Sequence, residues 1–228
     1  MTPPDGGRPV ETPRVGVGPW EGAWPADEEG RLPAHLDPEL LREGDARNVV
    51  DAYRYWRHEA VVADLDTRRH GFHVAVENWE HDFNIGSVVR TANAFNAAAV
   101  HIVGRRRWNR RGALGTDRDQ HERHHPDVAH LAAWAAERGL PLLGVDNVAG
   151  AVALEGYAVP RDCVLLLGQE GPGLSAQALA ACSDVLAITQ YGSTRSVNAG
   201  AAAAVVMYHG ALQHAGATGP SADPRPRA

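Results

Sequence analysis

The sequence predicts an α/β protein with a mostly parallel sheet flanked by helices. Two observations lead to this class. Apolar runs of strand length alternate with helical stretches along most of the chain, and these runs are nearly continuous rather than alternating apolar and polar. Continuous apolar runs are typical of strands that a parallel sheet buries on both faces. With 228 residues and 44% hydrophobic content, the chain is long enough to bury a sizeable core.

The expected elements follow one another in the order of an α/β fold. They are a helix within 38–64, a strand at 72–78, a helix at 84–97, a strand at 99–104, a basic segment at 104–125, a helix at 127–138, strands at 140–147 and 162–168, a short helix at 175–181, a strand at 184–190 and a long helix at 196–214. Residues 1–36 and 215–228 are rich in Pro and Gly without hydrophobic periodicity, which predicts flexible tails. We expect an N-terminal helical extension at 37–69 and the main domain at 70–214.

Composition narrows the class of protein further. Residues 1–20 contain no basic segment followed by an apolar run, and the small-residue stretch at 199–208 is too short to span a bilayer, so we expect a soluble, cytoplasmic protein. The two cysteines, Cys163 and Cys182, make neither a disulfide framework nor a metal set. We expect each of them in or beside the core as a small apolar residue.

The net charge of −6 is unevenly distributed along the chain. Residues 1–50 hold ten acidic and five basic side chains, which accounts for most of the excess. The basic segment at 104–125 instead carries seven arginines against three acids, together with three histidines. Because positive charge is concentrated in this segment, the negative net charge of the whole chain does not exclude a nucleic-acid partner.

The helix predicted at 84–97 carries one arginine, Arg90, among small and apolar residues. Its apolar residues share one face at the i, i+3, i+4, i+7 spacing of a core-facing stripe: Ile85, Val88, Val89, Ala92 and Phe95. Arg90 lies nearly opposite, and its nearest neighbours on the helix surface are Gly86, Asn93, Ala94 and Ala97. Arg90 is therefore either a solvated surface side chain or part of a face that another segment approaches closely.

Three junctions at strand ends could form a ligand site, because ligands of parallel sheets bind beyond the carboxyl ends of the strands. Asn84 stands at the start of the Arg90 helix, where its amide could cap the helix or face a ligand. Gly168, Gly171 and Gly173 form a tight loop around Pro172, without the spacing of a dinucleotide fold or a P-loop. Ser196 and Asn198 open the Ala-rich last helix, and Glu170 favours a ligand with positive or donor character over phosphate.

These three segments resemble the signature motifs of the SpoU/TrmH branch of the SPOUT RNA methyltransferases. The motifs read N-I-G-S-V-V-R-T-A-N-A-F at 84–95, G-Q-E-G-P-G-L-S at 168–175 and I-T-Q-Y-G-S-T-R-S-V-N-A-G-A at 188–201. The resemblance covers roughly residues 70–212. The sequence departs from the family pattern mildly, with Asn96 in place of Gly, Thr189 in place of Pro and Val197 in place of Leu.

The resemblance implies a SPOUT fold whose C-terminal segment forms a deep trefoil knot, an exception to the rule that chains avoid knots. It implies a homodimer that binds S-adenosylmethionine through the backbone at Gly168, Ile188 and Val197, and it implies no metal. The implied reaction is methyl transfer to a ribose 2′-hydroxyl of tRNA or rRNA. The alternative is a catalytically silent RNA-binding protein on the same fold.

The same resemblance assigns Arg90 as the catalytic arginine, with the polar residues Asn84, Glu170, Ser196 and Asn198 around it and the ribose. A guanidinium with a pKa above about 12 is a poor base unless it is strongly desolvated. We therefore favour an Arg90 that holds the RNA phosphate or stabilises the developing alkoxide by charge-assisted hydrogen bonds, and the role of general base stays open.

The basic segment is the expected RNA contact, through phosphate-binding arginines and a tryptophan that could stack on bases. These residues are Arg105, Arg106, Arg107, Trp108, Arg110 and Arg111. His121, His124 and His125 have an i, i+3, i+4 spacing that would suit zinc on a helix, but no carboxylate or cysteine partner stands at ligand spacing. RNA contact or a plain surface is the favoured interpretation of these histidines.

Overall fold

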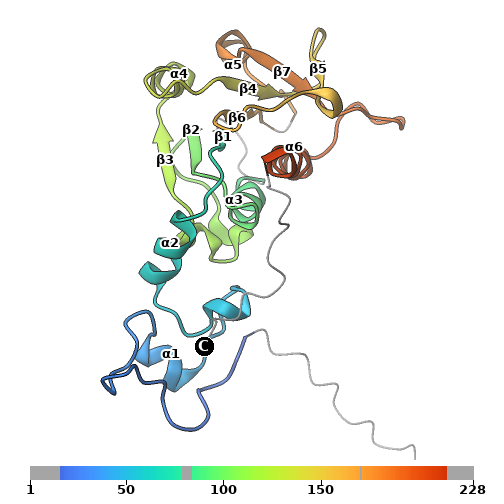
Figure 1. Cartoon of the computed structure of the whole chain (residues 1–228). Helices are drawn as coiled ribbons and strands as arrows, with labels where there is room; N and C mark the ends of the chain where they lie inside the picture. Colours follow the sequence, from blue (N-terminus) through green and yellow to red (C-terminus); the bar gives the residue numbers. More distant parts are fainter. Residues whose placement is uncertain (1–15, 79–83, 170, 215–228) are drawn as a thin grey trace, which may run out of the picture. The chain divides into compact units, whose positions relative to one another are not determined.

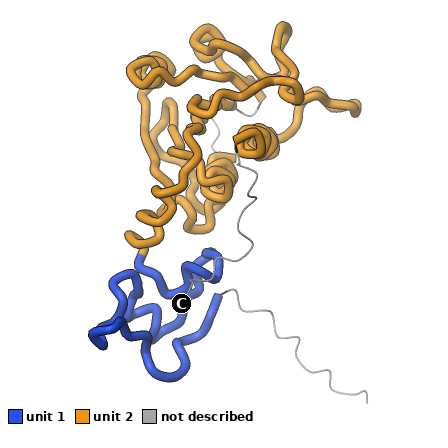
Figure 2. The backbone as a smooth tube through the Cα atoms, viewed as in Figure 1, with its two compact units in different colours: residues 1–57 blue, residues 58–228 orange. Residues whose placement is uncertain are grey.

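The computed structural model describes residues 16–78, 84–169 and 171–214. They divide into two compact units between Arg57 and His58, drawn blue and orange in Figure 2. The boundary therefore differs from the one expected after residue 69. Helix α2 (His58–Asp66) belongs to the second unit, where Asn96 donates a side-chain hydrogen bond of 3.3 Å to the carbonyl of Leu65.

The first unit has a structure of its own around a buried carboxylate. Asp45 is fully buried, and the Arg47 guanidinium donates to both of its oxygens at 2.8 and 2.6 Å. The backbone N–H of Tyr55 donates to Asp45 at 3.0 Å, and antiparallel bridges join Val17 to Asp45 and Leu36 to Trp56. Residues 16–36 are thus folded against later residues, which differs from the tail expected over 1–36.

The expected helix within 38–64 is divided into three short pieces. They are α1 (Pro38–Glu43), the 3-10 turn η1 (Asp51–Tyr53) and α2. The first piece stops at Gly44, whose φ of 94° is left-handed. Glycine adopts this conformation without a Cβ clash, so it ends the helix here.

The second unit is built on one sheet whose described strands all run parallel (Figure 1). The strands are β1 (His73–Asn78), β2 (Val100–Gly104), β3 (Glu122–His125), β4 (Leu142–Val145), β5 (Val152–Ala153), β6 (Val164–Leu167) and β7 (Asp184–Ala187). Their order across the sheet is β3-β2-β1-β6-β4-β7-β5. This topology confirms the predicted α/β class.

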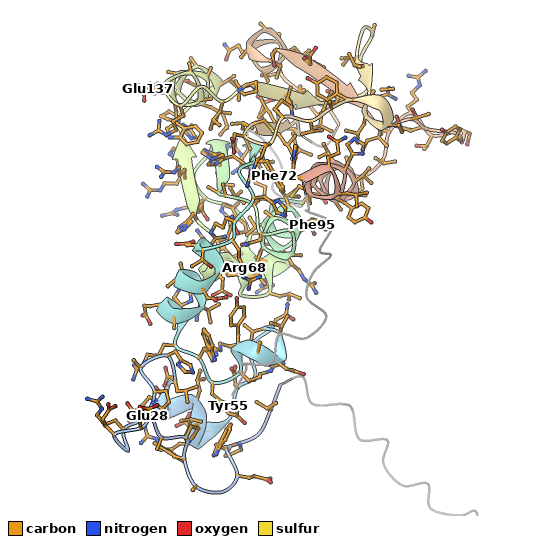
Figure 3. All side chains as sticks on the ribbon, in the orientation of Figure 1. Glu28, Tyr55, Arg68, Phe72, Phe95 and Glu137 are labelled. Atoms are coloured by element: carbon orange, nitrogen blue, oxygen red, sulfur yellow. The ribbon has the colours of Figure 1, made fainter. Side chains whose placement is uncertain are left out.

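Helices cover both faces of the sheet and create two apolar cores. Helices α3 (Ile85–Ala94) and α6 (Ala199–His214) contribute to one core, and α4 (Val128–Ala136) and α5 (Ala176–Ala181) to the other. Alternate residues of the inner strands enter opposite cores, as Val74 and Ala75 of β1 do, which is the two-residue period of a pleated strand. Phe72, just before β1, is 1% exposed and points into the core on the α3 side (Figure 3).

The basic segment contains structure that the sequence pattern does not predict. Two 3-10 turns, η2 (Arg110–Ala113) and η3 (Thr116–Asp119), precede strand β3 at the sheet edge. A third 3-10 turn, η4 (Leu154–Gly156), follows β5. Strand β3 has the sequence ERHH, and its first two residues are exposed. Because its residues are charged or polar, it lacks the apolar run that predicts the inner strands.

Candidate active site

A cavity of about 290 Å³ lies at the carboxyl ends of β4, β6 and β7. We call it the strand-end cavity. All three residues expected to bind the cofactor through their backbone line it, namely Gly168, Ile188 and Val197. Its walls are the loop 168–174, which follows β6, and the loop 188–198, which follows β7.

The loop 168–174 owes its shape to glycine. Gln169 and Gly173 exchange two backbone hydrogen bonds of 3.0 and 3.1 Å, and Gly173 has a left-handed φ of 74°. A side chain at Gly168 would overlap the backbone of Gly173 and Leu174. Only glycine fits at position 168, so the tight loop expected from the sequence depends on that residue.

The first and third motifs meet at their asparagines. Asn198 donates a side-chain hydrogen bond of 3.1 Å to Asn84 Oδ1. Its own Oδ1 accepts from the backbone N–H groups of Gly200 and Ala201 at 2.9 and 3.3 Å, so Asn198 caps α6. Asn84 makes no side-chain cap on α3 and uses its oxygen for this contact instead.

Arg90 lies on the exposed side of α3. In the apolar stripe opposite it, Ile85, Val88, Val89 and Ala92 are buried as predicted, and Phe95 is partly buried. The face beside Arg90 also receives another segment. Gly86 lies against the backbone of Gly112 in η2, where a Cβ on Gly86 would come within 2.7 Å of the Gly112 Cα. Arg90 itself does not line the strand-end cavity, whereas Ser196 and Asn198 do. Glu170 lies outside the described residues.

The structure divides the basic segment into exposed and engaged side chains. Trp108 is only 8% exposed and donates its indole N–H to Glu122 at 3.3 Å, so its ring is not presented at the surface for the expected stacking on RNA bases. Arg110 lies over the Trp108 ring at 4.7 Å and forms ion pairs of 2.8 Å with Asp117 and 3.0 Å with Glu122. Its charge is neutralised within the protein. The other arginines of the candidate RNA contact, Arg105, Arg106, Arg107 and Arg111, are exposed.

A buried side chain that sequence reasoning missed organises this segment. Asn78, the last residue of β1, donates its amide to the carbonyls of Arg105 and Arg107 at 2.6 and 3.0 Å. It is 2% exposed. Asn78 thus fixes the backbone from which the exposed arginines project.

The three histidines of the basic segment do not share a helix face. His124 and His125 lie on strand β3, so their side chains alternate across the sheet, and the helical spacing considered for zinc does not apply. His121 bonds to Asp66 at 2.8 Å and His124 to the carbonyl of Gly104 at 2.8 Å. Within the described ranges, no three His, Cys, Asp or Glu side chains are grouped to hold a metal ion.

His125 belongs instead to a chain of imidazoles across three neighbouring strands. His73 bonds to His101 at 3.1 Å, and His101 to His125 at 2.8 Å. Burial lowers the pKa of His73 to about 4 and that of His101 to about 2, and it lowers the pKa of His125 as well. These histidines are neutral structural groups at neutral pH.

Both cysteines lie in or beside the core, as predicted. Cys163 is buried and Cys182 half-buried, and neither forms a disulfide. Burial raises the pKa of the Cys163 thiol to about 12 and that of Cys182 to about 11. Neither thiol is suited to nucleophilic chemistry at neutral pH.

Three further residues of the strand-end cavity were not found from the sequence. Asp146 and Asn147 directly follow β4, a strand end that carries no glycine motif. Gln190 stands in the loop 188–198, and its side-chain carbonyl is buried without a hydrogen-bond partner in the described part of the chain. A buried acceptor of this kind is costly unless a donor satisfies it, so Gln190 marks a place where a ligand can bond.

Fold and cavity together define an α/β protein with a cavity at the strand ends of a parallel sheet, between two loops that lack a phosphate-binding fingerprint. The chain belongs to the SpoU rRNA methylase family, whose sequence model matches residues 71–208. This match confirms the family that the three motifs predict.

Two relatives are named as RNA methyltransferases. The tRNA (guanosine(18)-2′-O)-methyltransferase of Escherichia coli K12 is 25% identical over 160 residues, which are 69% of this chain and 70% of that enzyme. A protein of Mycobacterium ulcerans named as an uncharacterized tRNA/rRNA methyltransferase is 30% identical over 174 residues, which are 73% of this chain and 55% of that protein.

The crystal structure of the SpoU methyltransferase AviRb from Streptomyces viridochromogenes in complex with AdoMet shares the fold. Its TM-score is 0.59 and its identity 24%, over 67% of this chain and 61% of that one. The chain thus spans between 55% and 70% of the length of these three proteins. In the described part of the chain, no helix is long and apolar enough to cross a membrane.

Proposed function

We propose that this protein transfers the methyl group of S-adenosylmethionine to a ribose 2′-hydroxyl of tRNA or rRNA. The observation that carries the proposal is the strand-end cavity, in which Gly168, Ile188 and Val197 come together as the family resemblance implies. The contact between Asn84 and Asn198 supports it, because it joins the helix of Arg90 to the loop that walls this cavity. The methyltransferase domain, expected at 70–214, is proposed to include α2 as well.

The residues present fit S-adenosylmethionine. Glycine at 168 lets the loop 168–174 fold tightly against its own backbone beside the cavity, and the buried carbonyl of Gln190 offers an acceptor to the polar groups of the cofactor. Gly168, Ile188 and Val197 would hold the cofactor through their backbone, with Gln190 as a further contact. When bound, the cofactor would supply an electrophilic methyl group on a sulfonium, so no metal is needed; the thioether is the leaving group and the hydroxyl proton passes to water. The task of the protein is to position the hydroxyl and to exclude water.

Arg90 is proposed as the residue that acts on the RNA. Its exposed guanidinium can donate charge-assisted hydrogen bonds to a phosphate or to the oxyanion that develops at the ribose 2′-oxygen. Asn84, Ser196 and Asn198 are proposed to contribute polar groups around the ribose, as the family resemblance implies, and Glu170 is proposed to orient it. A proton abstracted directly by Arg90 would require a deprotonated guanidinium, which is why we favour the electrostatic role.

The exposed arginines of the basic segment are proposed to contact RNA phosphates. Within the described residues, Arg105, Arg106, Arg107 and Arg111 form none of the internal ion pairs that engage Arg110. A guanidinium that is already paired has less to gain from a phosphate. Trp108 and Arg110 are therefore left out of the proposed RNA contact.

A homodimer, a trefoil knot and a cytoplasmic location complete the proposal. The dimer is supported by an exposed apolar stripe on α6, made of Val205, Tyr208 and Leu212. Phe95 at the end of α3 extends this surface, with its ring 5.9 Å from that of Tyr208 (Figure 3). Exposed apolar stripes of this kind are typical of subunit interfaces.

The function is tested by incubating the purified protein with labelled S-adenosylmethionine and total tRNA or rRNA, followed by mapping of the labelled nucleotide. We expect a 2′-O-methylated ribose. Arg90→Ala should lower methyl transfer by about 10²-fold or more, the scale of a lost transition-state donor, and should leave cofactor affinity nearly unchanged. Equal loss of cofactor binding would contradict the role of Arg90. RNA binding without any label would favour the catalytically silent RNA-binding protein.

A further inference from the structure

Two adjacent side chains at the end of β4 reach both walls of the strand-end cavity. Asp146 accepts a hydrogen bond of 2.7 Å on Oδ2 from the backbone N–H of Leu174, at the end of the loop 168–174. Asn147 donates from Nδ2 to the backbone carbonyl of Arg195, in the loop 188–198, at 3.1 Å. The two loops are thus connected through two consecutive residues of a third element.

The Asp146 carboxylate packs directly against Gly173 of the loop 168–174. Gly173 lies against the Asp146 carboxylate so closely that a Cβ there would overlap Oδ2. The second carboxylate oxygen, Oδ1, accepts the backbone N–H of Asn147 at 2.7 Å. Both oxygens are therefore engaged by the backbone, which fixes the carboxylate in one orientation.

A second carboxylate binds Ser175, the N-cap residue of α5 that directly follows this loop. Glu77 of β1 is 1% exposed, and its Oε2 accepts the backbone N–H of Ser175 at 2.8 Å. Glu77 lies away from the cavity lining, whereas Asp146 and Asn147 both line it. Glu77 thus anchors the end of the loop 168–174 to the sheet, whereas Asn147 contacts the opposite wall of the cavity.

We propose that Asp146 and Asn147 are positioning residues that hold the loops 168–174 and 188–198 at the spacing the cofactor requires. This inference rests on the proposed function, because it assigns S-adenosylmethionine to the cavity. Loops that are held before binding lose less conformational freedom when the ligand enters, so the pair raises cofactor affinity without touching the reacting atoms. Once the cofactor is bound, the chemical step does not depend on the pair.

The test compares Asp146→Ala and Asn147→Ala with a matched control, Asp127→Ala, in the full-length protein. Asp127 also accepts a backbone N–H with its carboxylate, that of His130 at 2.9 Å, but it caps α4 and does not line the cavity. Calorimetric titration with S-adenosylmethionine should give a Kd roughly tenfold or more higher in both cavity variants and unchanged in the control. The kcat at saturating cofactor should stay near the wild-type value in all three.

Hydrogen exchange separates positioning from general loss of stability. In the wild type, cofactor should protect amides of both loops, and in Asn147→Ala the protection of 188–198 should be lost while that of 168–174 remains. Asn147 is exposed, so this variant keeps the test valid if Asp146→Ala does not fold. An unchanged Kd in Asn147→Ala, or an equal rise of Kd in Asp127→Ala, overturns the inference. A wild-type protein that binds no S-adenosylmethionine overturns the proposed function instead.

Discussion

The strand-end cavity is shaped by the backbone, whereas the basic segment presents side chains of which some bind within the protein and others are exposed. In the cavity, Gly168 and Gly173 bring two backbone stretches together, and the cofactor contacts expected there are backbone groups. In the basic segment, Trp108 is buried and Arg110 is paired with Asp117 and Glu122. Both regions carry a motif or a charge pattern in the sequence. All three residues expected to bind the cofactor line the cavity, whereas two of the six side chains expected to contact RNA are engaged within the protein.

The difference between the two regions has a physical cause. A glycine that permits a close backbone approach does so in any surroundings, so its role can be predicted locally. An arginine or a tryptophan can bind solvent, RNA or its own protein with similar energies, and the tertiary structure decides among them. Motifs of glycine are therefore safer guides to a site than runs of charge.

The largest expected effect on cofactor binding comes from adding a side chain at Gly168. Gly168→Ala places a Cβ against the backbone of Gly173 and Leu174, so the loop must move and cofactor binding should fall below detection in a calorimetric titration. Gly156→Ala is the control, because a Cβ there meets nothing within 4 Å. If Gly168→Ala binds S-adenosylmethionine like the wild type, the cavity does not depend on backbone geometry.

The burial of Trp108 gives the next largest effect. Trp108→Ala should lower the free energy of unfolding by about 3–5 kcal/mol, as measured by urea denaturation, because a large core side chain is removed. Trp108→Phe keeps most of the packing and should leave RNA affinity unchanged. If a Trp108→Phe protein of normal stability binds RNA more weakly than the wild type, Trp108 contacts RNA bases after all, and its burial does not define its role.

The exposed arginines should affect binding rather than stability. Replacing Arg105, Arg106 and Arg107 together by Gln should weaken RNA binding roughly tenfold and make its salt dependence shallower by about 0.7 for each phosphate that is no longer neutralised. Arg110→Gln, which breaks internal ion pairs, should leave that slope nearly unchanged. Filter binding at several salt concentrations measures the RNA affinity and its salt dependence. Identical slopes in the two variant proteins would contradict the distinction between exposed arginines that contact RNA and the internally paired Arg110.

The histidine chain predicts a smaller, pH-dependent effect on stability. Burial and the positive charges of Arg123 and Arg138 lower the pKa of His73 to about 4 and of His101 to about 2. The unfolded chain takes up protons below its ordinary histidine pKa of about 6.5, and the folded protein does not, so stability is full above that pH and falls as the pH drops towards 4. We expect the melting temperature to fall by several degrees over this range, at about 2–4 °C per kcal/mol.

A variant isolates this contribution. His101→Gln should melt at a lower temperature than the wild type at pH 8, because it leaves polar neighbours of His101 buried. Its melting temperature should then depend less steeply on pH between 6.5 and 4. Parallel curves for the two proteins would show that the buried imidazoles do not control acid stability.

Much of the fold and part of the site follow from local sequence. The apolar stripe of α3 and the apolar runs of the inner strands β1, β2, β4 and β6 are patterns that fit only burial in a core. Asn96, which stands where the family pattern has Gly, has a left-handed φ of 48°, a conformation that asparagine tolerates better than most residues. Strand β3 could not be found in this way, because a charged edge strand has no apolar run.

By itself, the sequence determined the α/β class, the family and the glycine-built loop around Gly168, because periodicity, order of motifs and the absence of a Cβ are properties of the chain alone. Only the tertiary structure decided that Asn198 bonds to Asn84 across 114 positions, that Asp146 and Asn147 join the two loops, and that Trp108 is buried. These outcomes depend on which partners the fold brings within hydrogen-bond distance. The residues next to a polar or aromatic side chain in the sequence do not determine which distant partner it will contact.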